Sequence, residues 1–221
     1  MADTPDAVLF QAVIDLLMES EGRVHAETAI AAAAALSGEA ALAVAGHDLR
    51  AARPGQAVFS RKVNGLLFGD VEDPRQWPET SIWGLFRDLL PDFDIPSETI
   101  PPVGELAKNA AAHVYDGGPW PYLSLPDEHW PQRGSLGLAA LLRPRAAEIA
   151  GSFGLSPELR MAGATLACLR LLGATRQVLP AAVGVRLALE TVIGAAKTCP
   201  LERPDQQVDP SSFDRAVLAF E

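Results

Sequence analysis

Two ionisable side chains that are able to do acid–base or metal chemistry, His25 and Glu27, open an alanine-rich stretch of the sequence. A histidine beside a carboxylate is a common pair for proton transfer or for metal ligation. Residues two apart on an α-helix point about 200° away from each other, so these two side chains are not expected to converge on one ion. The pattern also fits a helix cap followed by a first-turn acid that the helix dipole favours. We favour this second interpretation.

A second pair lies near the end of the chain, where Glu190 and Lys197 are two helical turns apart and therefore share one helix face. Arg186, one turn before Glu190, adds a cation to the same stripe. A salt-bridged surface stripe is the ordinary explanation of such a pattern. The alternative is a buried Glu190 that meets His25 in the core. Such a contact would perturb the pKa of both groups and would mark a functional site.

His129 lies in the most distinctive segment of the chain, residues 117–134, which read GGPWPYLSLPDEHWPQRG. The four prolines of this segment exclude a regular helix, and Trp130, a second tryptophan and a tyrosine are crowded among them. A rigid aromatic loop suits a lid or a partner-binding surface, because it loses little entropy on docking. Its aromatic side chains also suit a plug in the body of the protein. We favour the plug.

Motifs with a known mechanism do not occur in the sequence. It has no nucleotide-binding GxGxxG or GxxxxGK[ST], no HExxH zinc motif and no GxSxG nucleophile elbow. The four histidines lack metal-ligand spacing, and Cys168 and Cys199 form no CxxC pair, which favours two reduced, buried thiols. We therefore expect no metal and no cofactor. The sequence alone predicts no reaction.

Length and composition indicate one soluble globular domain. The chain has 221 residues, of which 48% are hydrophobic and 21% are charged, as in proteins that bury a core without metal or disulfide staples. A net charge of −10 makes nucleic acid and anionic membranes improbable partners. The N-terminal residues lack the features of a secretion signal. The apolar runs are shorter than the roughly 20 residues of a membrane span, so we expect a cytoplasmic protein.

The first two predicted helices have unusual compositions. The first begins at Thr4, carries Pro5 in its first turn and runs to about Ser20, with Gly22 as a stop signal. It is apolar on most of its circumference, which predicts burial on several sides or contact with another subunit. The second helix, from about His25 to Ala45, is rich in alanine and suited to close packing.

Caps, prolines and glycines predict the remaining helices. These cover about residues 81–90, 102–115, 135–153 with a break near Pro144, 156–174 and 180–197. Residues 46–80 contain short apolar runs that periodicity cannot assign, and we expect mostly helix and loop there. The sequence therefore predicts an all-α, single-domain orthogonal bundle of about six to eight helices over residues 1–200. Residues 201–221 are predicted to be a Pro-rich, polar C-terminal tail.

Several short pieces of the sequence occur together in a fixed order over roughly residues 22–200. They are His25-Ala26-Glu27-Thr28, Phe68-Gly69-Asp70, Ser81-Ile82-Trp83, Pro126-Asp127-Glu128-His129-Trp130-Pro131, and Glu190-Thr191 followed by Ala196-Lys197. This ordered set resembles an all-helical proteobacterial protein family that has no assigned activity. Glu128 departs from that family, which has glycine before the histidine. The resemblance implies no substrate or mechanism, but it directs attention to these positions.

Two functions are compatible with these patterns. The first is a helical protein without catalytic activity that acts through self-association as a homodimer. The alternative is a small-molecule-binding protein or enzyme with an inter-helix pocket lined by His25, Glu27, Glu190 and the loop 117–134. The candidate pocket residues are His25, Glu27, Trp83, His129, Trp130, Glu190 and Lys197. We favour the first function, because no geometric argument yet unites the candidate residues.

Overall fold

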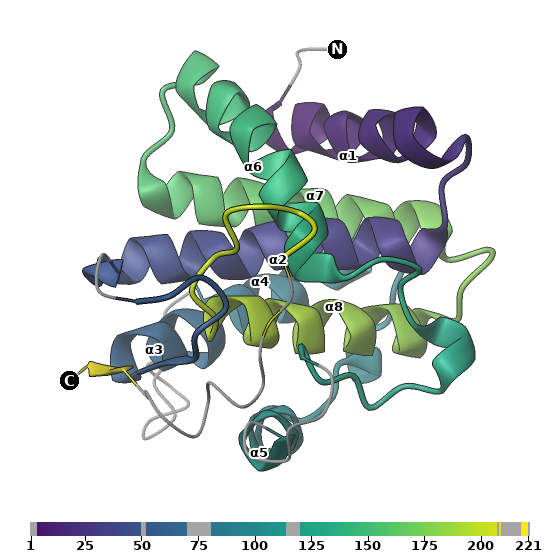
Figure 1. Ribbon diagram of the computed structural model, residues 1–221. Coiled ribbons are helices and arrows are strands. Elements are labelled where there is room, and N and C mark those ends of the chain that lie inside the picture. Colours follow the sequence, from purple (N-terminus) through teal and green to yellow (C-terminus); the bar gives the residue numbers. More distant parts are fainter. Residues whose placement is uncertain are drawn as a thin grey trace.

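The structure, a computed structural model, describes residues 4–49, 52–69, 81–113, 120–206, 208 and 218–220. Eight α-helices in this part of the chain form the single-domain all-α bundle that the sequence predicts (Figure 1). They are α1 (Pro5–Glu21), α2 (Ala26–Ala45), α3 (Arg61–Phe68), α4 (Ile82–Leu89), α5 (Val103–His113), α6 (Ser135–Ser152), α7 (Pro157–Thr175) and α8 (Ala181–Ala196). In Figure 1, α1, α2, α7 and α8 run broadly side by side, α6 crosses them obliquely and α5 is seen end-on.

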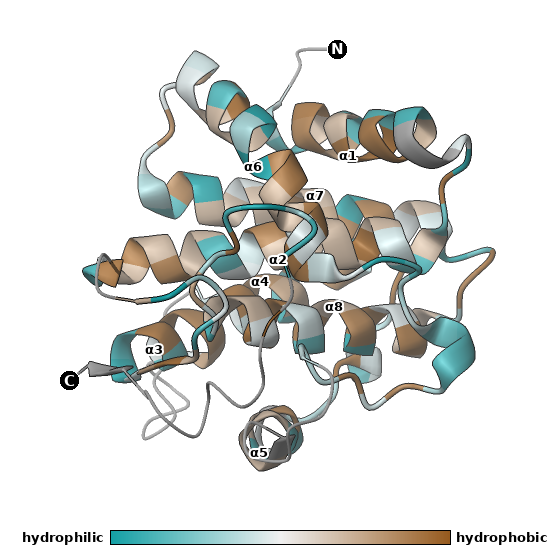
Figure 2. Cartoon of the chain, in the orientation of Figure 1, coloured by the Kyte–Doolittle hydropathy of each residue, from teal (hydrophilic) through white to brown (hydrophobic). Residues whose placement is uncertain are grey.

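The alanine-rich helix α2 lies at the centre of the bundle, packed against α6, α7 and α8. Its residues from Ala29 to Ala35 are completely buried, and few hydrophilic positions interrupt it (Figure 2). A Cβ atom added to Gly38 would lie 2.3 Å from the carbonyl oxygen of Val192 in α8. The backbones of α2 and α8 are therefore in direct contact, which only small side chains allow.

Among the described residues, α2 alone is long and apolar enough to cross a membrane by length and composition. The lengths of the uninterrupted apolar runs did not indicate this helix, because Ser37, Gly38 and Glu39 interrupt its apolar residues. Within the structure, 83% of its most apolar window is buried inside the bundle. This burial is what the core helix of a soluble protein shows.

Helix α1 lies on the outside of the bundle and packs against α6 and α7. It begins at Pro5 and ends at Gly22, whose φ of 67° is the left-handed conformation of a helix stop. Leu9, Val13 and Leu17 on its inner face are buried. One face of this apolar helix is therefore covered by its own chain.

Helix α6 continues through Pro144, whereas the sequence predicted a break there. Proline removes one backbone N–H and therefore one helical hydrogen bond. Pro144 itself is exposed, while Leu142 and Ile149 on either side of it are buried. Packing of the flanking turns keeps the helix intact, so the prediction of a break was wrong.

Two strands of three residues each, β1 (Val58–Ser60) and β2 (Leu218–Phe220), pair in parallel. This pairing was not predicted, because runs this short carry no readable period. Leu201, just past the predicted end of the helical domain, is 2% exposed, and its carbonyl accepts from Arg143 at 2.9 Å. Packing on the helices therefore extends past residue 200. The predictions for residues 70–80 lie outside the described residues.

Candidate functional site

Lys197 lies immediately after α8 and is held in place by the chain that enters α3. The amide of Val58 donates to the carbonyl of Lys197 at 2.8 Å, so strand β1 runs against this residue. The hydroxyl of Ser60 then accepts from the amide of Val63 and caps α3. The turn from β1 into α3 therefore places the side chains of both elements around the lysine.

The Lys197 amine is buried among these side chains. Its Nζ donates to Oδ1 of Asn64 at 2.7 Å and lies 5.5 Å from the centre of the Phe59 ring. Only 9% of the residue is exposed, and this burial lowers the pKa of the amine to about 8. The cause is desolvation, which disfavours the charged form of a buried lysine.

A cavity of about 290 Å³ adjoins the amine. Its walls come from β1, α3, α5 and the end of α8, which gather on the same side of the bundle in Figure 1. The lining residues are Phe59, Asn64, Phe68, Ala107, Ala110, Ala111 and Lys197. A volume of this size is near the lower end of the range of small-molecule sites, and an apolar wall with few polar groups is typical of them. The lysine and the asparagine are the polar groups of this wall.

Glu190 lies on α8 two turns before Lys197, but it is an anchor for the loop that crosses α8. The amide of Ser124 donates to its Oε2 at 2.8 Å, and the Ser124 hydroxyl donates to its Oε1. Arg186 approaches the same carboxylate at 3.8 Å and pairs with Glu105 at 2.6 Å. Burial raises the pKa of Glu190, and the bonds from Ser124 oppose that rise. The predicted surface stripe is thus partly buried.

The alternative interpretation of Glu190, a meeting with His25 in the core, does not occur. Gly38, in the second half of α2, packs on Val192, two residues past Glu190. Glu190 therefore lies beside the middle of α2, roughly ten residues or about 15 Å along the axis from His25. The gap beside Glu190 is only about 10 Å³, which is space for about one water molecule. The alternative of a ligand pocket built on Glu190 and His25 together is therefore not formed.

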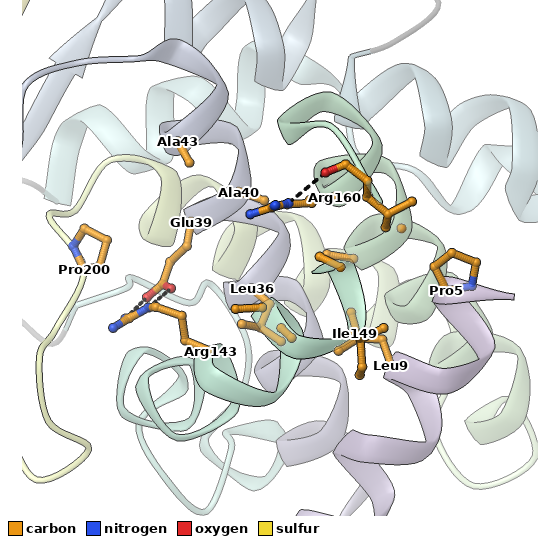
Figure 3. A pocket seen from close by; sticks show the side chains of 16 residues that line it. Pro5, Leu9, Leu36, Glu39, Ala40, Ala43, Arg143, Ile149, Arg160 and Pro200 are labelled. Atoms are coloured by element: carbon orange, nitrogen blue, oxygen red, sulfur yellow. Dashed lines mark hydrogen bonds and ion pairs between the residues drawn. The ribbon is translucent and has the colours of Figure 1, made fainter. Parts of the chain in front are cut away.

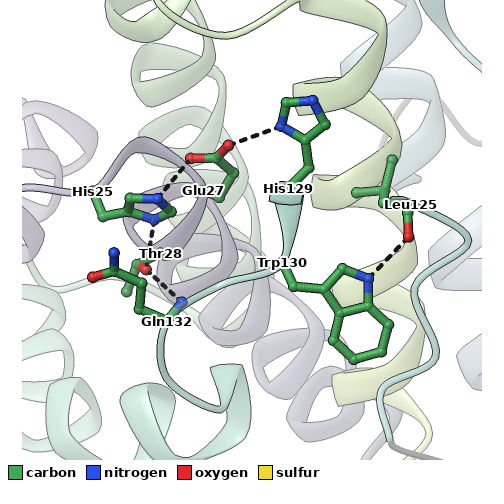
Figure 4. A network of polar contacts seen from close by, with 7 residues as sticks. All are labelled: His25, Glu27, Thr28, Leu125, His129, Trp130 and Gln132. Carbon is green, nitrogen blue, oxygen red and sulfur yellow. Dashed lines mark hydrogen bonds and ion pairs between the residues drawn. The ribbon is translucent and has the colours of Figure 1, made fainter. Parts of the chain in front are cut away.

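The Glu27 carboxylate instead lies between two imidazoles, those of His25 and His129 (Figure 4). Nδ1 of His129 is 3.0 Å from Oε1 of Glu27, and Nε2 of His25 is 3.4 Å from Oε2. The prediction that His25 and Glu27 diverge was wrong. His25 is the N-cap of α2 with extended backbone (φ −89°, ψ 125°), so the helical angle between the two residues does not apply.

This cluster fastens the aromatic loop to the start of α2. The Thr28 hydroxyl accepts from the amide of Gln132 at 3.1 Å and lies 3.1 Å from Nδ1 of His25. The hydroxyl proton is then available to Nδ1 of His25, which leaves its Nε2–H facing Glu27. No group of three His, Cys, Asp or Glu side chains in the described ranges is arranged to hold a metal ion. We interpret the cluster as a structural anchor.

Replacing Glu27 by alanine is expected to lower the free energy of unfolding by about 1–3 kcal/mol, because two half-buried imidazoles lose their carboxylate partner. Urea unfolding followed by circular dichroism measures this loss. Glu128→Ala removes an exposed carboxylate from the same loop and should change stability by less than about 0.5 kcal/mol. Equal, small effects of both changes would contradict the anchor role of Glu27.

Contacts at both ends hold the described part of the loop, residues 120–134, on the helices. At one end, Nε1 of Trp120 donates to the hydroxyl of Thr198 at 2.6 Å. Pro121 lies so close to Gly194 that an added Cβ on that glycine would be 2.3 Å from the proline Cβ. At the other end, Trp130 packs half-buried against the core. These contacts favour the plug over the lid.

The seven predicted site residues thus divide among four places. His25, Glu27 and His129 form the anchor cluster, and Trp130 lies beside it with Nε1 bonded to a loop carbonyl at 2.9 Å (Figure 4). Glu190 binds the middle of the loop, and Lys197 lines the cavity of about 290 Å³. Trp83, in α4, lies 5.6 Å from the guanidinium of Arg87 and is not part of that cavity wall.

The relationship of this chain to other proteins gives no further indication of a ligand. Comparisons with protein-family models, with curated proteins and with solved structures found no match. The resemblance to a helical proteobacterial family stays a prediction. The site must therefore be interpreted from its own geometry.

Sequence reasoning found Lys197 but missed the residues that surround it. Phe59 and Asn64 lie in the stretch 46–80, where short apolar runs gave no assignment. The three alanines of α5 carry no chemical signal, although they form one wall of the cavity. One sequence signal could have indicated the buried amine. A lysine directly after an apolar helix is buried together with the end of that helix.

Proposed function

We propose that this protein binds a small carbonyl compound in the Lys197 cavity and that the lysine amine forms an imine with it. The observation that carries the proposal is a buried amine on the wall of a cavity of about 290 Å³ lined by phenylalanine and alanine side chains. The neutral form of a lysine amine is the nucleophile. With a pKa of about 8, roughly a quarter of the amine is neutral at pH 7.5, against about a thousandth for an ordinary lysine.

The chemistry requires only the amine and a bound carbonyl group. The nitrogen lone pair of Lys197 attacks the carbonyl carbon, a C–N bond forms as the C=O π bond breaks, and one proton passes from the nitrogen to the oxygen to give a carbinolamine. The nitrogen then gives up its second proton, the C–O bond breaks and the oxygen leaves as water, which gives the imine. Asn64 orients the amine through its Oδ1 at 2.7 Å, and its amide N–H group is able to donate to the carbonyl oxygen. The apolar walls favour an uncharged aldehyde or ketone over an ionised acid.

Reductive trapping tests this proposal directly. The protein is incubated with propanal and sodium cyanoborohydride at pH 7.5, and alkylation is located by peptide mass mapping. The sequence has three lysines, and the other two, Lys62 and Lys108, are exposed and serve as internal controls. We expect Lys197 to be alkylated several-fold faster than either control. An unmodified Lys197 beside alkylated Lys62 and Lys108 would overturn the proposal.

The pH dependence of trapping is a second expected outcome. Alkylation of Lys197 should rise with pH and level off above about 8, where its amine is already neutral. Alkylation of Lys62 should keep rising toward pH 10, as for an exposed lysine. Measuring the rates between pH 6 and 10 in the Lys108→Arg variant separates the two residues. Identical pH profiles would contradict a special environment for Lys197.

Self-association through α1 is a second candidate function, supported by apolar residues that its own chain covers only in part. These half-buried side chains are Val8, Phe10, Ala12, Ile14 and Leu16. Met18, on the same helix, is 49% exposed. A helix that keeps such side chains at the surface suits a homodimer. Sedimentation velocity at micromolar concentrations tests this candidate, and a strict monomer would exclude it.

A cytoplasmic location is the last part of the proposal. Cys168 and Cys199 are both free and buried, as expected where the compartment keeps thiols reduced. Burial raises the pKa of the Cys168 thiol to about 12, so this thiol is an inert core group. Fractionation of the host cell tests the location.

A further inference from the structure

A second cavity, of about 240 Å³, opens between α1, α2, α6 and α7 (Figure 3). Buried apolar side chains form its floor, among them Leu9, Leu36 and Ile149. Six of its other lining residues are alanines from α2, α6 and α7. Alanine side chains are short, so helices that meet at these positions leave space that larger side chains would fill. The cavity therefore suits an apolar ligand.

Two arginines with different partners line this cavity. Arg143 is fully engaged, because its Nε and Nη2 donate to the Glu39 carboxylate at 2.9 and 2.8 Å and its Nη1 donates to the Leu201 carbonyl at 2.9 Å. Arg160 lies at the exposed rim, and its Nε donates to the Leu155 carbonyl at 3.1 Å. Within the part of the chain that the structure describes, the two terminal nitrogens of Arg160 make no hydrogen bond or ion pair with a protein group.

Charge and size together define the class of ligand. The Glu39–Arg143 pair is neutral as a unit, so Arg160 adds one net positive charge at the mouth of an apolar cavity. A guanidinium with free N–H groups binds a carboxylate through paired, charge-assisted hydrogen bonds. An apolar cavity of about 150 Å³ holds benzene, so a cavity of about 240 Å³ accommodates on the order of ten heavy atoms.

We propose that this cavity binds a monocarboxylic acid with an apolar body of about ten heavy atoms, such as a medium-chain fatty acid, with its carboxylate on Arg160. The apolar chain lies over Leu9, Leu36 and Ile149, where its burial drives binding. The proposal does not depend on Lys197, because the two cavities share no residue.

Isothermal titration calorimetry with octanoate tests the proposal, with 1-octanol and octylamine as ligands of similar length and different charge. Octanoate is expected to bind saturably, and the two other ligands at least about tenfold more weakly, because they lack the ion pair with Arg160. Octanol binding as tightly as octanoate would overturn the role of Arg160. Preference for octylamine, or no saturable octanoate binding at millimolar concentrations, would overturn the proposal as a whole.

Two variants locate the ligand in the cavity. Arg160→Met keeps the apolar stem, and octanoate affinity should fall to that of octanol. Gly163 lines the cavity, and an added Cβ there would meet nothing within 4 Å. Gly163→Leu is therefore expected to place its side chain in the cavity and to reduce the space for a ligand. This variant should stay folded by circular dichroism and lose binding, and unchanged affinity in either variant would overturn the site.

Two control variants should keep the affinity of the native protein. Arg145→Met removes an exposed arginine paired with Glu148 on the same helix α6. Lys197→Met alters the other cavity, so unchanged octanoate binding in that variant shows that this proposal and the imine proposal succeed or fail separately. A loss of octanoate binding in Arg145→Met equal to that in Arg160→Met would show that general charge, and not the Arg160 contact, governs binding.

Discussion

Replacing Lys197 by methionine is expected to stabilise the protein at pH 7, by about 2–3 kcal/mol in the free energy of unfolding. The amine has a pKa of about 8 in the folded protein and 10.5 as its ordinary value. Below pH 8 the folded protein holds the charged ammonium in a buried place, and that shift corresponds to roughly 3 kcal/mol. Methionine fills similar space without a charge, and loss of the hydrogen bond to Asn64 offsets about 1 kcal/mol of the gain.

The effect of this substitution should depend on pH in a defined direction. Between pH 8 and 10.5 the unfolded chain binds more protons at Lys197 than the folded protein does, so native stability rises with pH across that window. The methionine variant lacks this rise, and its advantage should disappear by about pH 10.5. Urea unfolding at pH 7, 8.5 and 10 measures both curves.

Lys62→Met is the matched control for this prediction, since Lys62 is exposed. Its stability should stay within about 0.5 kcal/mol of the native protein at each pH. A Lys197→Met variant that is less stable than the native protein at pH 7 would show that the lysine stabilises the fold. A lysine that destabilises the fold is expected where chemistry requires it, because functional sites are often built at the expense of stability.

Gly38→Ala is expected to destabilise the protein by about 3 kcal/mol or more, as overpacking of a tight helix contact does. An added Cβ would lie 2.3 Å from the Val192 carbonyl oxygen and 2.8 Å from the Ala196 nitrogen in α8. Both are backbone atoms of a buried helix, so relief requires α2 and α8 to separate. Differential scanning calorimetry measures the loss as a lower melting temperature.

Gly163→Ala is the control for Gly38→Ala. Gly163 also lies inside a helix, α7, but an added Cβ there meets nothing within 4 Å. Alanine has the higher helix propensity, so this change should stabilise the protein by about 0.5–1 kcal/mol. Opposite signs for the two substitutions would show that close contact decides the effect. A stabilising Gly38→Ala would contradict the direct backbone contact of α2 and α8.

Local signals predicted most of the helices, because caps and stops act on neighbouring residues. Ser156 caps α7 by accepting from the amide of Leu159, and Gly22 ends α1 in the left-handed conformation. The break at Pro144 was wrong, because tertiary packing of the flanking turns outweighs one missing hydrogen bond. The pairing of β1 with β2 joins segments far apart in the sequence, which local signals do not report.

The candidate site was less predictable, since it depends on which segments meet. Periodicity placed Glu190 and Lys197 on one face of a helix, but not the elements that cover that face. Ser124 covers Glu190, whereas Asn64 and Phe59 cover Lys197. His25 shows a second limit. Its place one residue outside α2, at the N-cap, reversed the expected direction of its side chain relative to Glu27.

The central position of α2 has a consequence for how the protein is made. More than 100 residues separate the end of α2 at Ala45 from the start of α7 at Pro157, and α8 follows later still. At typical synthesis rates a ribosome needs about 5–20 s to add 100 residues. During that time α2, the most apolar helix of the nascent chain, is already synthesised, whereas its packing partners α7 and α8 are not. This interval makes α2 a segment that chaperones are expected to shield during translation.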